Sequence, residues 1–220
     1  MGYTLNFAAV WRDFDLLLQG LGLSLLLAAA SIVAGAALGL LVAFMLQSKQ
    51  ALLRRTAGVY VTAIRNTPLL VLILFAYFAL PQIGLRLGKI ESFILTLMIY
   101  SGAYLAEIFR SGLIAIPRGM REAGLAIGLT EFQTRISVII PIMIRNVLPS
   151  LGSTLISLFK DTSLAAAIAV PELTFYARKI NNETFRVVET WIVVSLLYVV
   201  TCSLLAAILR VVEGRLRIAR

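Results

Sequence analysis

Long runs of apolar residues, separated by short polar stretches, make up most of the chain. A helix that crosses a membrane needs about 20 consecutive, mostly apolar residues. Five stretches are long and apolar enough: 16–46, 56–80, 90–109, 132–170 and 190–209. Strand-like alternation is too short for a membrane barrel, so helices must satisfy the backbone in the bilayer. The pattern predicts an all-α integral membrane protein with five transmembrane helices in one domain, 1–220.

Composition agrees with a membrane protein. Hydrophobic residues make up 60% of the chain and charged residues only 14%, whereas about a quarter of a soluble domain is charged. The formal net charge of +9 does not indicate nucleic-acid binding, because the basic residues flank the apolar runs and form no single patch. Within the first run, Gly35 and Gly39 form a small-xxx-small pair that permits close helix contact, either inside the chain or between two copies.

The charges between the runs indicate how the chain is oriented. The segments after the first, third and fifth runs hold eleven basic residues against three acidic ones. These basic residues are Lys49, Arg54, Arg55, Arg110, Arg118, Arg121, Arg135, Arg210, Arg215, Arg217 and Arg220. The N-terminal segment and the other loops hold six residues of each sign. Since cytoplasmic loops carry the excess of Lys and Arg, five spans place the N-terminus outside and the C-terminus in the cytoplasm.

The loop at 113–131 is polar but keeps helical spacing. Residues 121–127 are predicted to form a short helix, which Gly128 can end in the left-handed conformation. Thr130 and Gln133 then match a capping box, in which each side chain satisfies a backbone N–H of a new helix. From spacing alone, this loop is either an ordinary connection with an interfacial helix or a surface for a partner protein.

A set of spaced residues in and after this loop distinguishes it from an ordinary connection: Glu122, Ala123, Gly124, Gly128, Val138, Ile140 and Pro141. The set resembles the EAA motif of the permease subunits of ABC importers. One residue departs from that motif, since Gly124 stands in place of the second alanine. Small side chains occupy both forms, so close docking remains possible, although glycine weakens a helix by about 1 kcal/mol relative to alanine.

Four further segments are similar to the polar amino acid permeases of that family, in the family's order: Arg65–Leu70, Ser101–Arg110, Ile114–Gly119 and Ile156–Leu164. The resemblance covers roughly half of the chain. It implies a type I ABC importer permease of the bacterial inner membrane, in which this chain forms half of the pore for a polar amino acid.

The resemblance also implies partners. The loop would be a cytoplasmic coupling helix that docks in a groove of an ATPase subunit through Arg121, Glu122, Ala123, Gly124 and Gly128. ATP and Mg²⁺ would bind the two ATPase subunits, with no cofactor on this chain. A second permease, identical or homologous, would complete the pore. An extracytoplasmic binding protein would deliver the amino acid to the outer face, where it would contact the loop from Pro171 to Glu189.

Charged residues inside the apolar runs are candidates for the substrate pathway, because a charge in hydrocarbon is costly unless it faces protein or water. Lys160 and Asp161 fall near mid-membrane, and could bind the two charged groups of an amino acid or simply neutralise each other. The hydroxyls of Thr162 and Ser163 follow them. The full candidate set is Lys160, Asp161, Thr162, Ser163, Ser101, Tyr104 and Arg65. For Arg65, Glu107 and Arg145, snorkelling or an internal ion pair is an alternative explanation.

The sequence indicates a transport subunit and not an enzyme. It contains no Walker A loop and no G-x-S-x-G elbow, so ATP hydrolysis is expected on a separate subunit. It has no histidine and one cysteine, which disfavours a zinc site. The alternative function is a stand-alone, ion-coupled secondary transporter or channel, in which Lys160 and Asp161 would carry an ion or proton. Such carriers often contain repeats, and we find none here.

Overall fold

Every secondary-structure element in the computed structural model, which describes residues 3–216, is helical. The elements are α1 (Ala8–Arg12), α2 (Phe14–Leu46), α3 (Ala51–Arg65), α4 (Leu69–Leu74), η1 (Phe75–Ala79), η2 (Leu80–Ile83), α5 (Lys89–Ile114), α6 (Arg118–Ala126), α7 (Glu131–Thr134), η3 (Arg135–Ile139), α8 (Ile140–Asp161), η4 (Thr162–Ile168), α9 (Leu173–Thr184) and α10 (Val187–Leu216). Two of the basic residues used for orientation, Arg217 and Arg220, lie outside the described residues.

Within residues 3–216, four helical segments are long and apolar enough to cross a membrane: Phe14–Leu46, Lys89–Ile114, Glu131–Ile168 and Val187–Arg215. The second expected span, 56–80, is not one continuous helix. Its two halves, Ala51–Arg65 and Leu69–Ile83, meet at a bend of 101°. Pro68 explains the break, because proline lacks an N–H and disfavours helical backbone at the residue before it.

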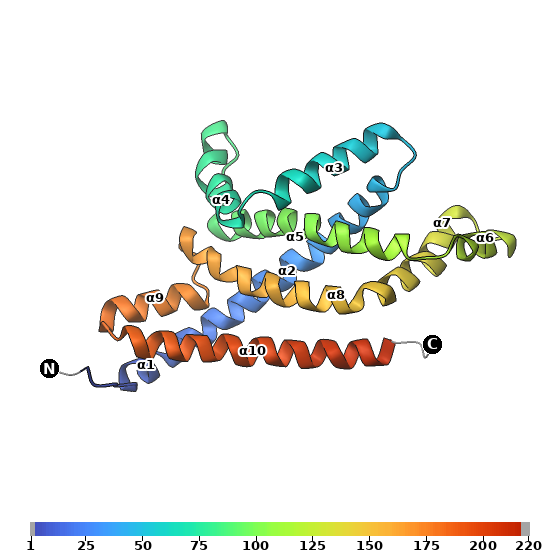
Figure 1. Cartoon of the computed structure of the whole chain (residues 1–220). Helices are drawn as coiled ribbons and strands as arrows, with labels where there is room; N and C mark the ends of the chain where they lie inside the picture. The colour runs from blue at the N-terminus through green and yellow to red at the C-terminus, as the bar shows by residue number, and fades with distance from the viewer. Residues whose placement is uncertain (1–2, 217–220) are drawn as a thin grey trace.

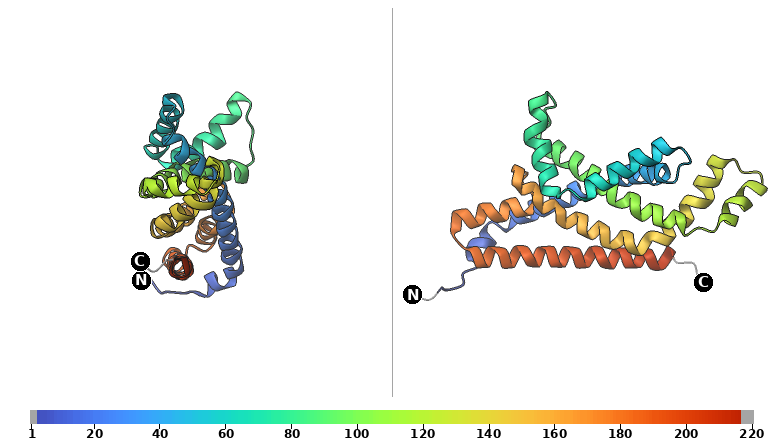
Figure 2. Two further views of the ribbon diagram at one scale, coloured as in Figure 1. Left: turned by 90° about the vertical axis from the view of Figure 1, so that its right-hand side faces the viewer. Right: turned by 45° about the horizontal axis from the view of Figure 1, so that its top comes forward.

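The long helices α2, α5, α8 and α10 form an elongated bundle (Figure 1). The helices α6 and α7 lie at one end of the bundle, together with the C-terminal end of α10, whereas the N-terminal segment and α9 lie at the other end (Figure 1). The two further views agree that α3 and α4 project from the side opposite α10 (Figure 2). The two ends of the described chain therefore lie at opposite ends of the bundle.

Glycine residues allow α2 and α5 to pack closely at the centre of the bundle. A Cβ atom added at Gly35 would lie 1.9 Å from the Ser101 Oγ, and one added at Gly39 would lie 2.9 Å from the carbonyl oxygen of Gly102. On α5, a Cβ at Gly102 would lie 2.9 Å from the hydroxyl of Tyr60 in α3. The small-xxx-small pair therefore serves packing within the chain.

Glu172 joins α9 to two spans, a role that the sequence analysis did not predict. Its side chain is fully buried and accepts hydrogen bonds from the backbone N–H groups of Thr174 (2.9 Å) and Phe175 (2.7 Å), which caps α9. The hydroxyls of Ser24 in α2 and Tyr198 in α10 donate to the same carboxylate, at 3.3 and 3.4 Å. Burial raises the pKa of Glu172 to about 7, although these hydrogen bonds oppose the rise.

We expect the stability of the permease to fall as the pH rises through neutrality. The pKa of Glu172 is raised from 4.5 to about 7 in the folded chain, so the folded state holds this proton more tightly than the unfolded state. Its contribution is complete below about pH 4.5 and is lost as the pH rises through about 7. The Tm of the purified permease should drop by on the order of 5 °C between about pH 5 and pH 8. Glu172→Gln should flatten this dependence, and an unchanged slope in that variant would contradict the assignment.

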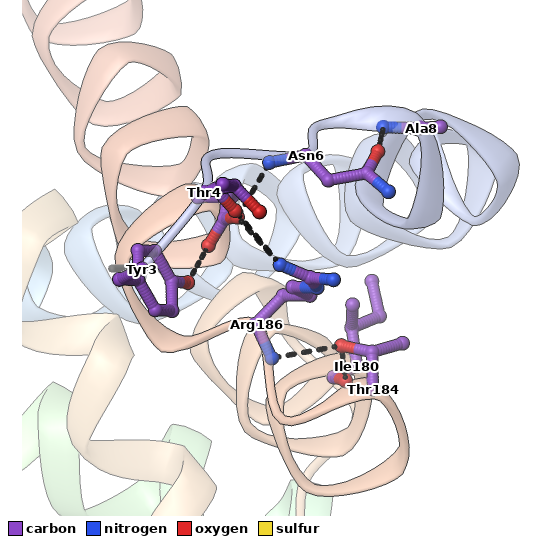
Figure 3. Close-up of polar contacts among 8 residues, drawn as sticks. Tyr3, Thr4, Asn6, Ala8, Ile180, Thr184 and Arg186 are labelled. Carbon is purple, nitrogen blue, oxygen red and sulfur yellow. Dashed lines mark hydrogen bonds and ion pairs between the residues drawn. The ribbon is translucent and has the colours of Figure 1, made fainter. Parts of the chain in front are cut away.

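The N-terminal segment is bound to the first turn of α10 and to the residue just before it. The Tyr3 hydroxyl and the Asn6 backbone N–H donate hydrogen bonds to the carboxylate of Glu189, which is fully buried. Arg186 donates to the carbonyl oxygen of Thr4 at 3.1 Å (Figure 3). Together these contacts join the segment before α1 to the start of α10.

Candidate functional site

The elbow between α5 and α8, residues 118–134, has the local structure that the sequence predicts. Gly128 ends α6 with a φ of +89°, in the left-handed region. The Thr130 hydroxyl accepts a hydrogen bond from the Gln133 N–H at 3.2 Å, and the Gln133 side chain accepts one from the Thr130 N–H at 2.9 Å. The left-handed glycine and the capping box are both confirmed.

The elbow presents a mixed polar and apolar surface. Glu122 and Ala123 are exposed on α6, and so are the large apolar side chains of Met120, Ile127 and Phe132. Exposed large apolar side chains next to charged groups are typical of a protein-interaction surface.

Arg121 and Gly124 face the elbow itself. The Arg121 guanidinium forms an ion pair with Glu131 in α7, with its Nε 3.2 Å from Oε2, and thus connects the two arms. Gly124 is buried, and a Cβ atom added there would lie 2.7 Å from the Cγ2 of Thr134. The departure from the EAA pattern therefore has a steric reason, because only glycine leaves room for Thr134 at this distance.

A second group of polar side chains gathers where α3, α5 and the end of α8 come together; Arg65 is exposed there, and Tyr100, Tyr104 and Asp161 are half-buried. The Arg65 guanidinium lies 5.1 Å from the centroid of the Tyr104 ring, a cation–π distance. The Tyr100 hydroxyl donates to the Tyr104 hydroxyl at 3.2 Å. Both Arg65 and Asp161 lie close enough to Tyr100 to act on it electrostatically. Three predicted residues, Arg65, Tyr104 and Asp161, are thus brought together around a tyrosine pair, the Arg65–Asp161 cluster.

Tyr100 is a member of this cluster that the sequence analysis missed. It stands four residues before Tyr104 on α5, so the two side chains share one helix face. The ring centroids are 4.8 Å apart. The i, i+4 spacing was the signal that could have identified it.

Other predicted pathway residues lie elsewhere. Ser101 is fully buried between α2 and α5 and donates to the carbonyl oxygen of Ser31 at 3.3 Å. Thr162 is fully buried and donates to the carbonyl oxygen of Phe159 at 2.7 Å. Both hydroxyls are covered within this chain, and the role of Ser101 and Thr162 in the substrate pathway stays a prediction. Ser163 is half-buried in η4.

Lys160 is exposed, and its charge acts on the Asp161 carboxylate without a close ion pair between them. Among the ion pairs of the described residues none contains Lys160, because neighbours in a helix point in different directions. Glu107 instead pairs with Arg110 at 2.6 Å, one turn further along α5, which agrees with the internal ion pair expected for it. Arg145 is exposed on α8.

Comparison with known proteins places the whole chain in one family. Residues 35–218 match the family model described as "Binding-protein-dependent transport system inner membrane component". The glutamine transport system permease protein GlnP of Escherichia coli (strain K12) is 38% identical over 215 residues, covering 97% of this chain and 98% of that protein. The L-cystine transport system permease protein TcyB of Bacillus subtilis (strain 168) is 36% identical, covering 98% and 93%.

Solved structures share the fold. The crystal structure of an amino acid ABC transporter with histidines contains a chain that matches with a TM-score of 0.87 and 32% identity, covering 97% of this chain and all 100% of that one. An inward-facing structure of the MetNI methionine ABC transporter matches with a TM-score of 0.80 and 21% identity over 94% of this chain and 99% of that one; at that identity it supports the fold alone. The chain therefore belongs to the binding-protein-dependent transport system inner membrane components, the permease subunits of ABC importers.

Proposed function

We propose that this permease forms half of the pathway by which a polar amino acid crosses the inner membrane, with a second identical or homologous permease forming the other half. Family membership supports an ATP-driven importer that works with ATPase and binding-protein partners. It does not support the alternative of a stand-alone, ion-coupled carrier. The names of the relatives, which include glutamine and L-cystine permeases, support an amino acid as the substrate.

The observation that carries the substrate proposal is the Arg65–Asp161 cluster. An amino acid presents a carboxylate and an ammonium group, and the cluster offers a guanidinium and a carboxylate near two tyrosine hydroxyls. Arg65 would hold the substrate carboxylate, since guanidinium–carboxylate pairs are strong and directional. Asp161 would hold the ammonium group. Arg65 and Lys160 are both exposed; Arg65 is the better partner for the carboxylate because its guanidinium already lies over the Tyr104 ring in the cluster.

The coupling function falls to the elbow. Its exposed surface, which includes Glu122, Ala123, Ile127 and Phe132, would dock in a groove of an ATPase subunit, and ATP and Mg²⁺ would bind there. The elbow lies at the same end of the bundle as the end of α10 (Figure 1), where the excess of basic residues is found. Both facts support a cytoplasmic position for the elbow and the C-terminus, with the N-terminus outside.

The opposite end of the bundle would receive the binding protein. A hollow of about 450 Å³ opens there between η4 and α9, lined by Ala166, Ala169, Phe175, Arg178, Lys179, Asn182 and Glu183. Its charged rim suits a transient, polar contact. The hollow lies next to η4, which continues directly from Asp161, so the delivery site and the proposed pathway are close in the chain.

ATP hydrolysis by the complex in proteoliposomes tests this proposal. The rate of ATP hydrolysis by the wild-type complex should rise when binding protein and the transported amino acid are added. Glu122→Lys should reduce this stimulation by about tenfold or more, because a charge reversal at a docked surface opposes the partner. Asp15→Lys, at an exposed acidic position on the other end of the bundle and outside the lining of the hollow proposed for the binding protein, is the matched control and should leave it unchanged.

Either of two results would overturn the proposal. One is amino acid uptake without any ATPase subunit present, which would identify a carrier of another class. The other is full stimulation of the Glu122→Lys complex, which would show that α6 has no part in coupling.

A further inference from the structure

Among the three glycines of the elbow, Gly124 is the one with a close neighbour in the described chain, Thr134. An added Cβ at Gly124 would lie 2.7 Å from Cγ2, 3.1 Å from Oγ1 and 3.4 Å from Cβ of Thr134. Thr134 is fully buried, and its Oγ1 has no hydrogen-bond partner within the described part of the chain. The threonine therefore acts here through its shape and not through its hydroxyl group.

Further contacts cross the elbow on both sides of this point. Arg121 in α6 pairs with Glu131 in α7, and the Leu129 N–H donates to the carbonyl oxygen of Gly124 at 3.2 Å. The Thr130 capping box fixes the start of α7. With Thr134 seated against Gly124, α6 and α7 are held as one rigid piece.

The helix beyond Thr134 is built differently. Residues Arg135–Ile139 form the π-helical turn η3, which leads into α8 just before Pro141. Proline cannot donate a backbone hydrogen bond, and π-turns accommodate such an interruption. The rigid elbow is therefore followed by the π-helical turn η3, which leads into α8, the helix that ends at Asp161.

We propose that Thr134 is a positioning residue: seated on Gly124, it fixes the angle between the coupling helix and α8, so that displacement of α6 reaches α8 instead of bending the elbow. This inference rests on the proposed docking of α6 to the ATPase. A methyl group at residue 124 would push the two arms apart. Loss of the Thr134 methyl would leave them loose. In both variants the complex should still hydrolyse ATP but should transport fewer amino acids per ATP.

Four substitutions test this in the reconstituted complex, by the number of amino acids transported per ATP hydrolysed. Gly124→Ala should lower this ratio by about fivefold, and Thr134→Ser should lower it because the methyl group is lost. Thr134→Val keeps the shape of threonine and should retain the wild-type ratio. The matched control is Gly119→Ala, on the same helix, where an added Cβ meets no described atom within 4 Å; it should change nothing.

The pair Gly124→Ala with Thr134→Ser is the decisive variant, because the smaller serine makes room for the new methyl group. The ratio should return toward the wild-type value. Equal ratios for Gly124→Ala and Gly119→Ala would overturn the inference, as would a double variant no better than Gly124→Ala. If Gly124→Ala does not assemble, a lowered ratio in Thr134→Ser with a normal one in Thr134→Val still supports it, and equal ratios overturn it.

Failure of the underlying docking proposal would be seen separately. Phe132 is exposed on the elbow surface, and Phe132→Glu should weaken co-purification of the ATPase subunits. Unchanged co-purification would argue against docking at this surface, whatever the Gly124 and Thr134 variants do.

Discussion

Replacing Gly39 with valine is expected to prevent the permease from accumulating in a folded form. A Cβ at this position would lie 2.9 Å from the carbonyl oxygen of Gly102 and 3.0 Å from the backbone nitrogen of Ala106. Neither atom can rotate away, so α2 and α5 would have to separate. Overpacking of a core costs about 1–3 kcal/mol and occasionally more, and here it affects the central helix pair. Size-exclusion chromatography of the purified subunit would show loss of the monodisperse peak and a lower yield.

Gly22→Val is the matched control for this result. It lies on the same helix and is exposed, and an added Cβ there meets no described atom within 4 Å. We expect yield and elution to stay near those of the wild type. A Gly39→Val permease that behaves like Gly22→Val would show that α2 and α5 do not pack as described.

Asp161→Asn is expected to reduce amino acid uptake by about tenfold or more in a complex that still assembles. The substitution keeps the shape of the side chain but removes the negative charge proposed to hold the substrate ammonium group. Charge-assisted hydrogen bonds are about twice as strong as neutral ones, and an ammonium group left without one in the pathway binds poorly. Uptake of labelled amino acid into proteoliposomes, corrected for the amount of assembled complex, measures the effect.

The neighbouring residue supplies the control. Lys160 is exposed and makes no contact with the tyrosine pair of the Arg65–Asp161 cluster that the described residues show, so Lys160→Met should leave uptake within about twofold of the wild type. Normal uptake by Asp161→Asn would remove this residue from the pathway. A large loss in Lys160→Met alone would instead favour the lysine as the carboxylate ligand.

Features of the fold that depend only on residues close together in the sequence could be predicted. The left-handed Gly128 and the capping box of Thr130 and Gln133 were predicted, because each requires only a turn of the chain. The apolar runs likewise indicated where long helices lie. Pro68 carried a signal for a break, but the apolar run from 56 to 80 continues across it, and hydropathy alone treats such a run as one span.

Features that depend on which helices meet could not be predicted in this way. Ser101, Tyr104 and Tyr100 all lie on α5, yet only packing against α2 and α3 decides that Ser101 is covered while the tyrosines face Arg65. Glu172 looks like one more acidic loop residue until Ser24 and Tyr198 converge on it. The partner of Gly124 is also ten residues away, across two turns of the elbow.

The bend at Pro68 has a consequence for how this protein is made. At about 1.5 Å per residue, the 15 residues of α3 extend only about 22 Å, which is less than the thickness of the hydrocarbon core. α3 also carries Arg54, Arg55 and Arg65, and each arginine opposes release from the translocon into lipid. α2, with 33 largely apolar residues, can enter the bilayer as soon as it leaves the ribosome. Within the described chain α3 packs against both α2 and α5, and α4 packs against α5, so we expect the bent segment to reach its final place only when α5 has been made.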